Sequence, residues 1–224
     1  MSQATPTLHA EPDHEHVPFL QHHFAEMGQQ FDASKIGMWL FLVTEVLLFG
    51  GLFVGYGIMH AKHSAAFMEA HHQLSRPLGV TNTIVLLVSS FTMVMAVWSA
   101  QTSKRKLLIL FLTLTLLLAG TFLVIKGFEY HHKFAEGLLP GQYYTHQGDT
   151  VPGQFLFFSF YFMMTGLHGI HVILGMAAIT WLLLRAIRGD FNAAYYGPVD
   201  LVGLYWHLVD MIWIYLFPLM YLIS

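Results

Sequence analysis

The sequence contains no cysteine among its 224 residues. It can therefore form neither a disulfide bond nor a metal site with thiolate ligands, and its cysteine content says nothing about redox compartment. Charged residues are also scarce: they make up 10% of the chain, against 55% for hydrophobic residues, and the mean hydropathy is +0.55. This balance is too apolar for a soluble domain with a wet surface, so the composition is typical of a membrane protein.

Several other patterns are missing. No segment alternates polar and apolar residues with the short period of a transmembrane β-strand, which favours an all-helical protein. The first residues lack the basic start and apolar core of a signal peptide. No Gly-rich phosphate cradle and no serine nucleophile with a base at recognisable spacing are present, and we expect no nucleic-acid partner.

Long apolar runs predict five transmembrane helices. Crossing a hydrocarbon core of ~30 Å takes about 20 residues at a rise of 1.5 Å each. The predicted spans are about 36–59, 78–100, 107–128, 154–184 and 201–223. The fold class is therefore an all-α, polytopic membrane bundle of five transmembrane helices. Residues 1–35 form a His-rich cytoplasmic N-terminal tail in this prediction, and residues 36–224 form the transmembrane domain.

The distribution of lysine and arginine predicts the orientation. With five spans, the N-terminus shares a side with the second and fourth connections, and that side carries six of the ten basic residues, including the compact "KRK" at 104–106. Basic residues concentrate in cytoplasmic loops. We therefore expect the N-terminus in the cytoplasm and the C-terminus outside.

Glu45 lies in the middle of the apolar stretch "LFLVTEVLLFGGLF". Nine residues from Ile36 place it about 14 Å into the membrane, near the midplane. An isolated carboxylate at that depth costs ~3 kcal/mol on insertion scales, so it should face protein or water. Two interpretations remain open: a buried hydrogen bond between helices, or a carboxyl that handles protons or reacts with inhibitors.

The last two spans carry histidines and an aspartate. His168 and His171 are three residues apart, so we expect them to share a helix face that contacts another helix. His207 and Asp210 have the same spacing, and an aspartate beside a histidine can fix its tautomer or form an ion pair. These residues suggest interhelical hydrogen bonding. The alternative is a haem ligated by two histidines on facing helices.

Lys126 and Glu129 lie near the end of the third span, where lysine side chains reach the membrane surface. Their i, i+3 spacing allows an ion pair. We expect surface anchoring there. In the second span, Asn82, Ser89 and Ser90 are uncharged groups suited to hydrogen bonds between helices.

Five segments resemble, in order and spacing, the signature segments of subunit III of haem-copper terminal oxidases. They are "MWLFLVTEVLLFGGLF", "NTIVLLVSS", "FEYHHKF", "TGLHGIHVILGM" and "YWHLVDMIWIYLF". The resemblance implies a non-catalytic subunit in aerobic respiratory electron transport, with no active site or metal of its own. Haems and copper would lie in partner subunits I and II. In this family, subunit III binds phospholipid, packs directly on subunit I and sustains proton uptake by that oxygen-reducing subunit.

The resemblance also suggests roles for individual residues. Glu45 resembles the family's membrane-buried glutamate, which is known to react with carbodiimide, and His168, His171, His207 and Asp210 resemble polar residues that the bundle buries without a metal. Glu129 is expected among the interhelical polar or lipid contacts. The full-length family has seven spans, and this chain has only the later five, which is familiar among bacterial members and suggests a bacterial inner membrane.

Some alternatives remain. The glutamate in "TEVLLF" favours the cytochrome c branch, but quinol oxidases and nitric oxide reductase clusters use related accessory subunits. A haem-b membrane anchor of a quinone-linked enzyme could use His171 and His207. A small transporter built around Glu45 and Asp210 is disfavoured because the sequence shows no internal repeat and no paired broken helices.

Overall fold

The computed structural model describes residues 21, 24–140, 144 and 153–222. These residues form six helices: α1 (Met27–Lys62), α2 (Ser64–His71), α3 (Arg76–Gln101), α4 (Arg105–Ala135), α5 (Gln154–Arg188) and α6 (Gly197–Tyr221). Five are long and apolar enough to cross a membrane, and the remaining one, α2, has eight residues. The predicted all-α bundle with five spanning helices is confirmed.

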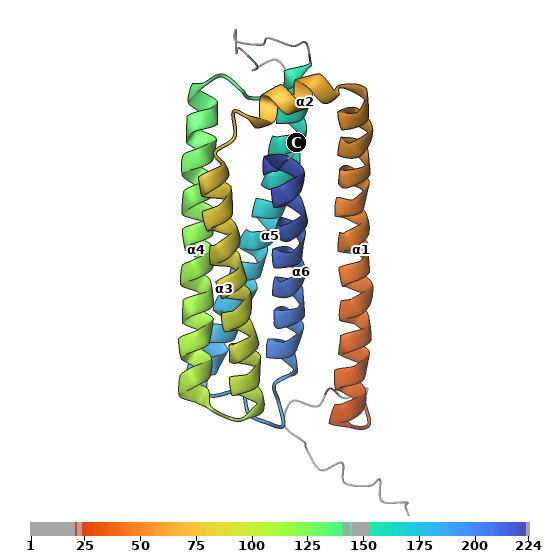
Figure 1. The fold of residues 1–224 in the computed structure, drawn as a ribbon. Coiled ribbons are helices and arrows are strands. Elements are labelled where there is room, and N and C mark those ends of the chain that lie inside the picture. Colours follow the sequence, from red (N-terminus) through yellow and green to blue (C-terminus); the bar gives the residue numbers. More distant parts are fainter. Residues whose placement is uncertain (1–20, 22–23, 141–143, 145–152, 223–224) are drawn as a thin grey trace, which may run out of the picture.

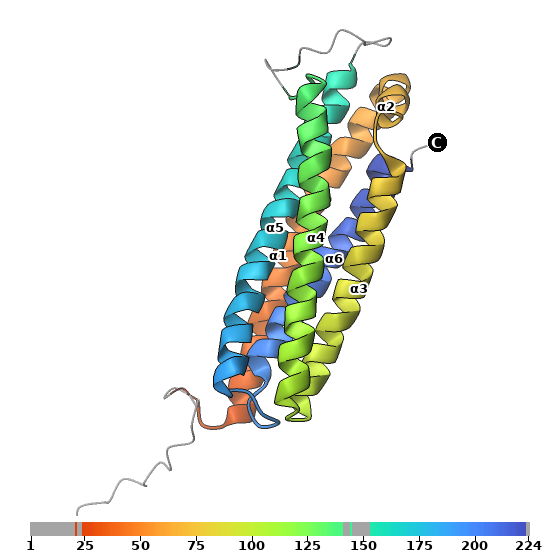
Figure 2. The same ribbon diagram turned by 90° about the vertical axis from the view of Figure 1, so that its left-hand side faces the viewer.

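The long helices stand side by side, and α2 lies across one end of the bundle (Figure 1). We call this end, where α6 finishes, the α2 end, and the opposite end, where α1 begins, the N-terminal end. Helices α3 and α4 form a close pair, and α6 packs against both α3 and α5 (Figure 2). The "KRK" turn between α3 and α4 lies at the N-terminal end.

Each long helix extends beyond its predicted span at one end or at both. Helix α1 begins nine residues before Ile36, and α4 continues seven residues past Phe128. Hydropathy locates only the apolar part of a helix, whereas backbone hydrogen bonds continue through polar residues outside it. Helix α5 ends at Arg188, and the residue that follows it, Gly189, has a φ of 92°, which glycine readily adopts. The predicted N-terminal tail therefore overlaps α1, and its first twenty residues lie outside the described part.

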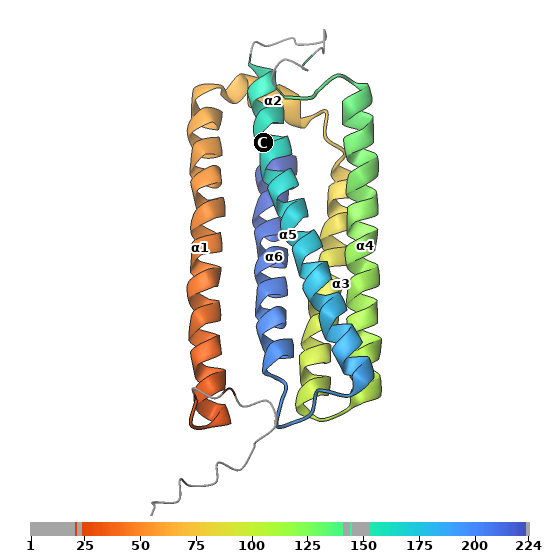
Figure 3. The same ribbon diagram turned by 180° about the vertical axis from the view of Figure 1, so that it is seen from behind.

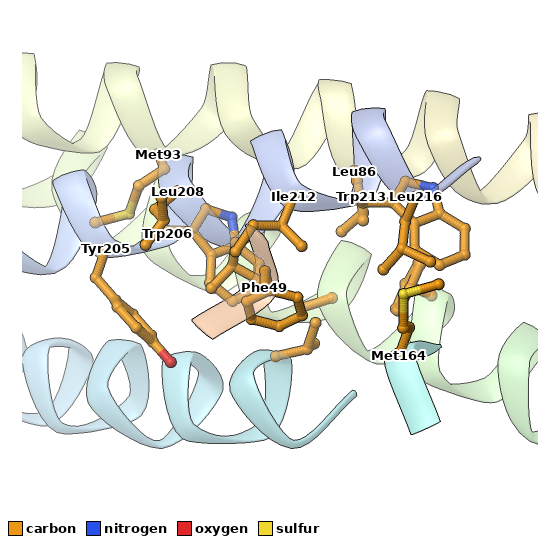
Figure 4. Close-up of a cluster of buried hydrophobic side chains, with 14 of the residues drawn as sticks. Phe49, Leu86, Met93, Met164, Tyr205, Trp206, Leu208, Ile212, Trp213 and Leu216 are labelled. Carbon is orange, nitrogen blue, oxygen red and sulfur yellow. The ribbon is translucent and has the colours of Figure 1, made fainter. Parts of the chain in front are cut away.

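Helix α6 forms the centre of the core. Figure 4 shows Trp206, Ile212, Trp213 and Leu216 projecting from it among residues of the neighbouring helices, and all four are buried. Gly175 of α5 permits a close approach of α6, because a Cβ atom there would lie 2.7 Å from the ring of Trp206. The fourth span therefore does contact another helix, as its polar residues led us to expect.

Helix α1 lies at the edge of the bundle and contacts it through a narrow seam (Figure 3). Only 11% of the most apolar 18-residue stretch of α1 is buried. Its buried residues, Leu42, Phe49 and Tyr56, recur every seven positions. A seven-residue repeat keeps one stripe facing the partner helix, so α1 presents most of its circumference to the surroundings of the bundle.

Candidate functional site

Glu45 and His171 form a direct tie between α1 and α5. The Oε2 atom of Glu45 lies 2.8 Å from Nε2 of His171, and both side chains are largely buried. The other ring nitrogen, Nδ1, lies 2.8 Å from the carbonyl oxygen of Leu167, one turn earlier on α5. The prediction that Glu45 faces protein agrees with this contact, while its functional role remains a prediction.

This geometry determines how the pair holds its protons. The Leu167 carbonyl can only accept, so Nδ1 of His171 must carry a hydrogen and donate it. One further proton then lies between Nε2 and Glu45, either on the carboxyl or on the imidazole. Both arrangements have zero net charge, which reduces the cost of placing the pair inside a membrane. The pair can therefore hold two helices together without an uncompensated charge.

Three polar contacts among the described residues join α1 to α5 and α6 at three levels along its length. At the N-terminal end, Lys35 Nζ lies 3.2 Å from Asp200 of α6, and the Glu45 contact follows in the middle. Near the α2 end, the hydroxyl of Tyr56 donates to the Leu219 carbonyl of α6 over 2.9 Å. Because α1 buries few apolar side chains, these ties are expected to set its position on the bundle.

His168 faces different neighbours from His171. Its ring packs 5.3 Å from that of Trp213 and 5.6 Å from that of Phe122, measured between centroids. Neither ring nitrogen has a hydrogen-bond partner among the described residues, although the side chain is fully buried. The two histidines are adjacent on α5, as their spacing predicted, but one turns toward α4 and α6 and the other toward α1.

His207 and Asp210 belong to the contact between α6 and α3. The hydroxyl of Ser90 on α3 lies 2.8 Å from Nδ1 of His207, which is the interhelical bond that the sequence suggested. Asp210 is 3% exposed, and within the described residues neither carboxyl oxygen has a hydrogen-bond partner by distance and angle. The predicted direct pairing of His207 with Asp210 is therefore not among the described hydrogen bonds.

Lys126 and Glu129 do form the predicted ion pair, with Lys126 Nζ 3.0 Å from Glu129 Oε2. The expectation of surface anchoring is wrong, because the two residues are only 7% and 3% exposed. The Lys126 ammonium also donates to the hydroxyls of Tyr161 on α5, at 3.2 Å, and Tyr221 on α6, at 3.0 Å. The Tyr221 hydroxyl in turn donates to Glu129.

We call Lys126, Glu129, Tyr161 and Tyr221 the α4 clasp. Besides its hydrogen bonds, the Lys126 ammonium lies 5.1 Å from the Trp213 ring centroid, within cation–π range. Sequence spacing identified the ion pair but not its tyrosine partners, which lie 35 and 95 residues from Lys126. The available sequence signal for these partners was the presence of aromatic residues near the ends of α5 and α6. That signal is weak, because such residues are also common at membrane interfaces.

Two apolar grooves run along α6 in its half nearer the N-terminal end. The groove beside α3 has a volume of about 350 Å³ and the groove beside α1 about 360 Å³. Leu204 and His207 line both, so we treat them together as the α6 trough. Lys35, paired with Asp200, and Lys104, which lies 4.1 Å from the Trp98 ring centroid, stand at its N-terminal end.

Among the described residues, no group of three or more histidine, cysteine, aspartate or glutamate side chains is arranged to hold a metal ion. The haem alternative required His171 and His207 as ligands. Both ring nitrogens of His171 are already engaged, by Leu167 and Glu45. His207 turns instead toward α3 and the α6 trough. This arrangement does not fit a haem held between the two histidines.

Comparison with known proteins identifies the chain's relatives. The family model described as "Cytochrome c oxidase subunit III" matches residues 19–224. The chain is 31% identical to a probable quinol oxidase subunit 3 of Staphylococcus saprophyticus, over 89% of this chain and 93% of that protein. It is also 31% identical to a probable cytochrome c oxidase subunit 3 of Nocardia farcinica, over 84% of this chain and 87% of that protein.

Proposed function

The chain belongs to the cytochrome c oxidase subunit III family, and from this premise we propose that it is the non-catalytic subunit III of a proton-pumping terminal oxidase. It would pack directly on subunit I and lie in one complex with subunit II, and those subunits would hold the haems and copper. Relatives named for cytochrome c and for quinol are equally similar. The proposal therefore concerns the accessory role that both kinds of oxidase share.

The engagement of His171 is the observation that best supports an accessory role over a haem-binding anchor. With Nδ1 donating to Leu167 and Nε2 bound to Glu45, His171 has no free nitrogen for iron. Glu45 then supports the oxidase by fixing α1 to α5 and carries no redox chemistry. Its replacement by glutamine should leave most of the turnover intact, because a glutamine side chain can still reach Nε2 of His171 by donating from its amide.

Purification through a tag on this chain in mild detergent tests the accessory role. We expect a haem-copper oxidase core to co-purify, and we expect all haem to leave with that core when the subunit is stripped away. A visible haem spectrum on the stripped chain would contradict the proposal. An assembled Glu45→Gln complex that has lost oxygen reduction entirely would contradict the role given to Glu45. Comparing turnover with reduced cytochrome c and with quinol identifies the electron donor.

We further propose that the α6 trough binds phospholipid acyl chains. Its lining is apolar apart from a few side chains, and it ends near Lys35 and Lys104, which can interact with a lipid phosphate. The basic side chains at this end also support the predicted orientation, with the N-terminus in the cytoplasm of a bacterial cell and the C-terminus outside.

The variant Leu204→Trp would fill the part of the trough that both grooves share. Native mass spectrometry of the purified complex should then show fewer retained lipids than in the wild type. Ile173→Trp is a matched control, because Ile173 is exposed on α5 outside the trough. Equal lipid retention in the wild type and the Leu204→Trp complex would argue against lipid binding in the trough.

A further inference from the structure

His71, the last residue of α2, forms two side-chain hydrogen bonds. Its Nδ1 atom lies 2.6 Å from the carbonyl oxygen of Met68, and its Nε2 atom lies 3.0 Å from a guanidinium nitrogen of Arg76 at the start of α3. The side chain is 1% exposed. A carbonyl only accepts hydrogen bonds and a guanidinium only donates them. His71 must therefore be neutral, with its hydrogen on Nδ1 and a lone pair on Nε2.

We propose that His71 and Arg76 form a pH-sensitive latch that holds the turn between α2 and α3 closed. Protonation of His71 would add a hydrogen to Nε2, the atom that accepts the hydrogen bond from the Arg76 guanidinium. The contact would then join two donors that both carry positive charge, and a repulsive contact would replace an attractive one. The turn, residues 72–75, would lose the bond that joins its two flanking helices.

The charged and titratable groups around His71 reinforce this effect. In the turn, the His72 ring lies 4.1 Å from that of His71 between centroids, and on α3 Arg76 faces the imidazole directly. From α4, Lys133 donates to the Gln73 carbonyl of the turn and pairs with Glu136. From α5, the uncharged Gln154 contacts the Gln73 amide. From α1, His60 packs against α2, with its ring on Phe67. The side chains in direct contact with His71, those of His72 and Arg76, are thus neutral or cationic, and the Glu136 carboxylate is paired with Lys133.

The direction of the pH dependence follows from proton linkage. Burial, together with His72 and Arg76, lowers the pKa of His71 from its ordinary value of 6.5, and the Met68 carbonyl opposes this only in part. The open turn therefore binds a proton more tightly than the closed turn. The neutral His71 favours the closed turn fully above about pH 6.5, the ordinary pKa. This contribution is lost as the pH falls toward and through the lowered pKa of His71 in the closed turn. Between these two pKa values, the equilibrium constant for opening the turn rises by up to about tenfold for each unit by which the pH falls.

Hydrogen exchange in the intact, purified oxidase complex tests the latch. Backbone exchange of peptides that cover residues 66–80 would be followed by mass spectrometry from about pH 5 to 8 and corrected for intrinsic rates. We expect opening to increase as the pH falls, while a peptide from the middle of α4 stays protected throughout. His71→Gln should keep low exchange at every pH, because the glutamine amide both donates and accepts but does not titrate.

Two further variants keep the test decisive. His72→Gln removes the exposed neighbouring histidine and should retain most of the pH dependence, because burial and Arg76 still lower the pKa of His71. Arg76→Gln removes the exposed cation that faces Nε2 of His71 and should weaken the pH dependence, which tests the latch even if the His71 variant fails to assemble. A turn whose corrected exchange is independent of pH, or a His71→Gln turn that responds as the wild type does, would overturn the latch. Because the readout is exchange, the result is independent of the oxidase role.

Discussion

Replacing Lys126 by methionine tests whether the α4 clasp holds α4, α5 and α6 together. Methionine keeps the length and apolar stem of lysine but removes the charge and every hydrogen bond. Lys126 and Glu129 are on the same helix, so they can still pair when the helices separate in the membrane. The contribution to helix association therefore comes from the bonds to Tyr161 and Tyr221 and from the ring of Trp213.

The expected loss of stability can be estimated from these contacts. Hydrogen bonds between membrane helices contribute about 0.6 kcal/mol on average and up to about 1.7. A desolvated cation–π contact adds up to about 2 kcal/mol. The Lys126→Met variant also leaves the Glu129 carboxylate buried without its cation, and breaking a buried pair in this way typically costs about 3–5 kcal/mol in total. We therefore expect a loss of about 3–5 kcal/mol.

Reversible unfolding of the complex in lipid bilayer discs, followed for this subunit, measures the change. The double variant Lys126→Met, Glu129→Gln removes both charges and should recover part of the loss, because no carboxylate then remains uncompensated. Lys106→Met, at an exposed position of α4, serves as the control and should stay within about 0.5 kcal/mol of the wild type. A Lys126→Met variant as stable as this control, or a double variant less stable than the single one, would refute the reasoning.

Two further predictions concern packing. Gly175→Ala should destabilise the bundle by about 1–3 kcal/mol in the same unfolding assay, because the new methyl group would lie 2.7 Å from the Trp206 ring. Gly120→Ala is the control and should be neutral or stabilising, because its new methyl group would have no neighbouring atom within 4 Å. His168→Phe should leave stability unchanged or raised, because the imidazole nitrogens have no described partner and the new ring would still pack on Trp213. A loss above about 1 kcal/mol in the same assay would contradict this expectation.

Interactions close in sequence were the most predictable part of the site. The i, i+3 spacing of Lys126 and Glu129 predicted their ion pair, and the depth of Glu45 predicted a side chain that faces protein. Burial of the ion pair was missed, because the position of lysine near a helix end is typical of surface anchoring. The spacing of His168 and His171 predicted adjacent side chains but not their separate neighbours, since three residues advance the helix by about 300° and leave the side chains about 60° apart.

The sequence by itself determined the number of spanning helices, because crossing a hydrocarbon core demands a fixed apolar length that hydropathy measures directly. It also determined which residues are too polar to face lipid. Only the tertiary structure decided where those residues find partners: Glu45 with His171, 126 residues away, and Lys126 with Tyr221, 95 residues away. Such pairings depend on which helices lie side by side and at what register. Periodicity within one helix identifies a polar face but contains no information about the helix that covers it.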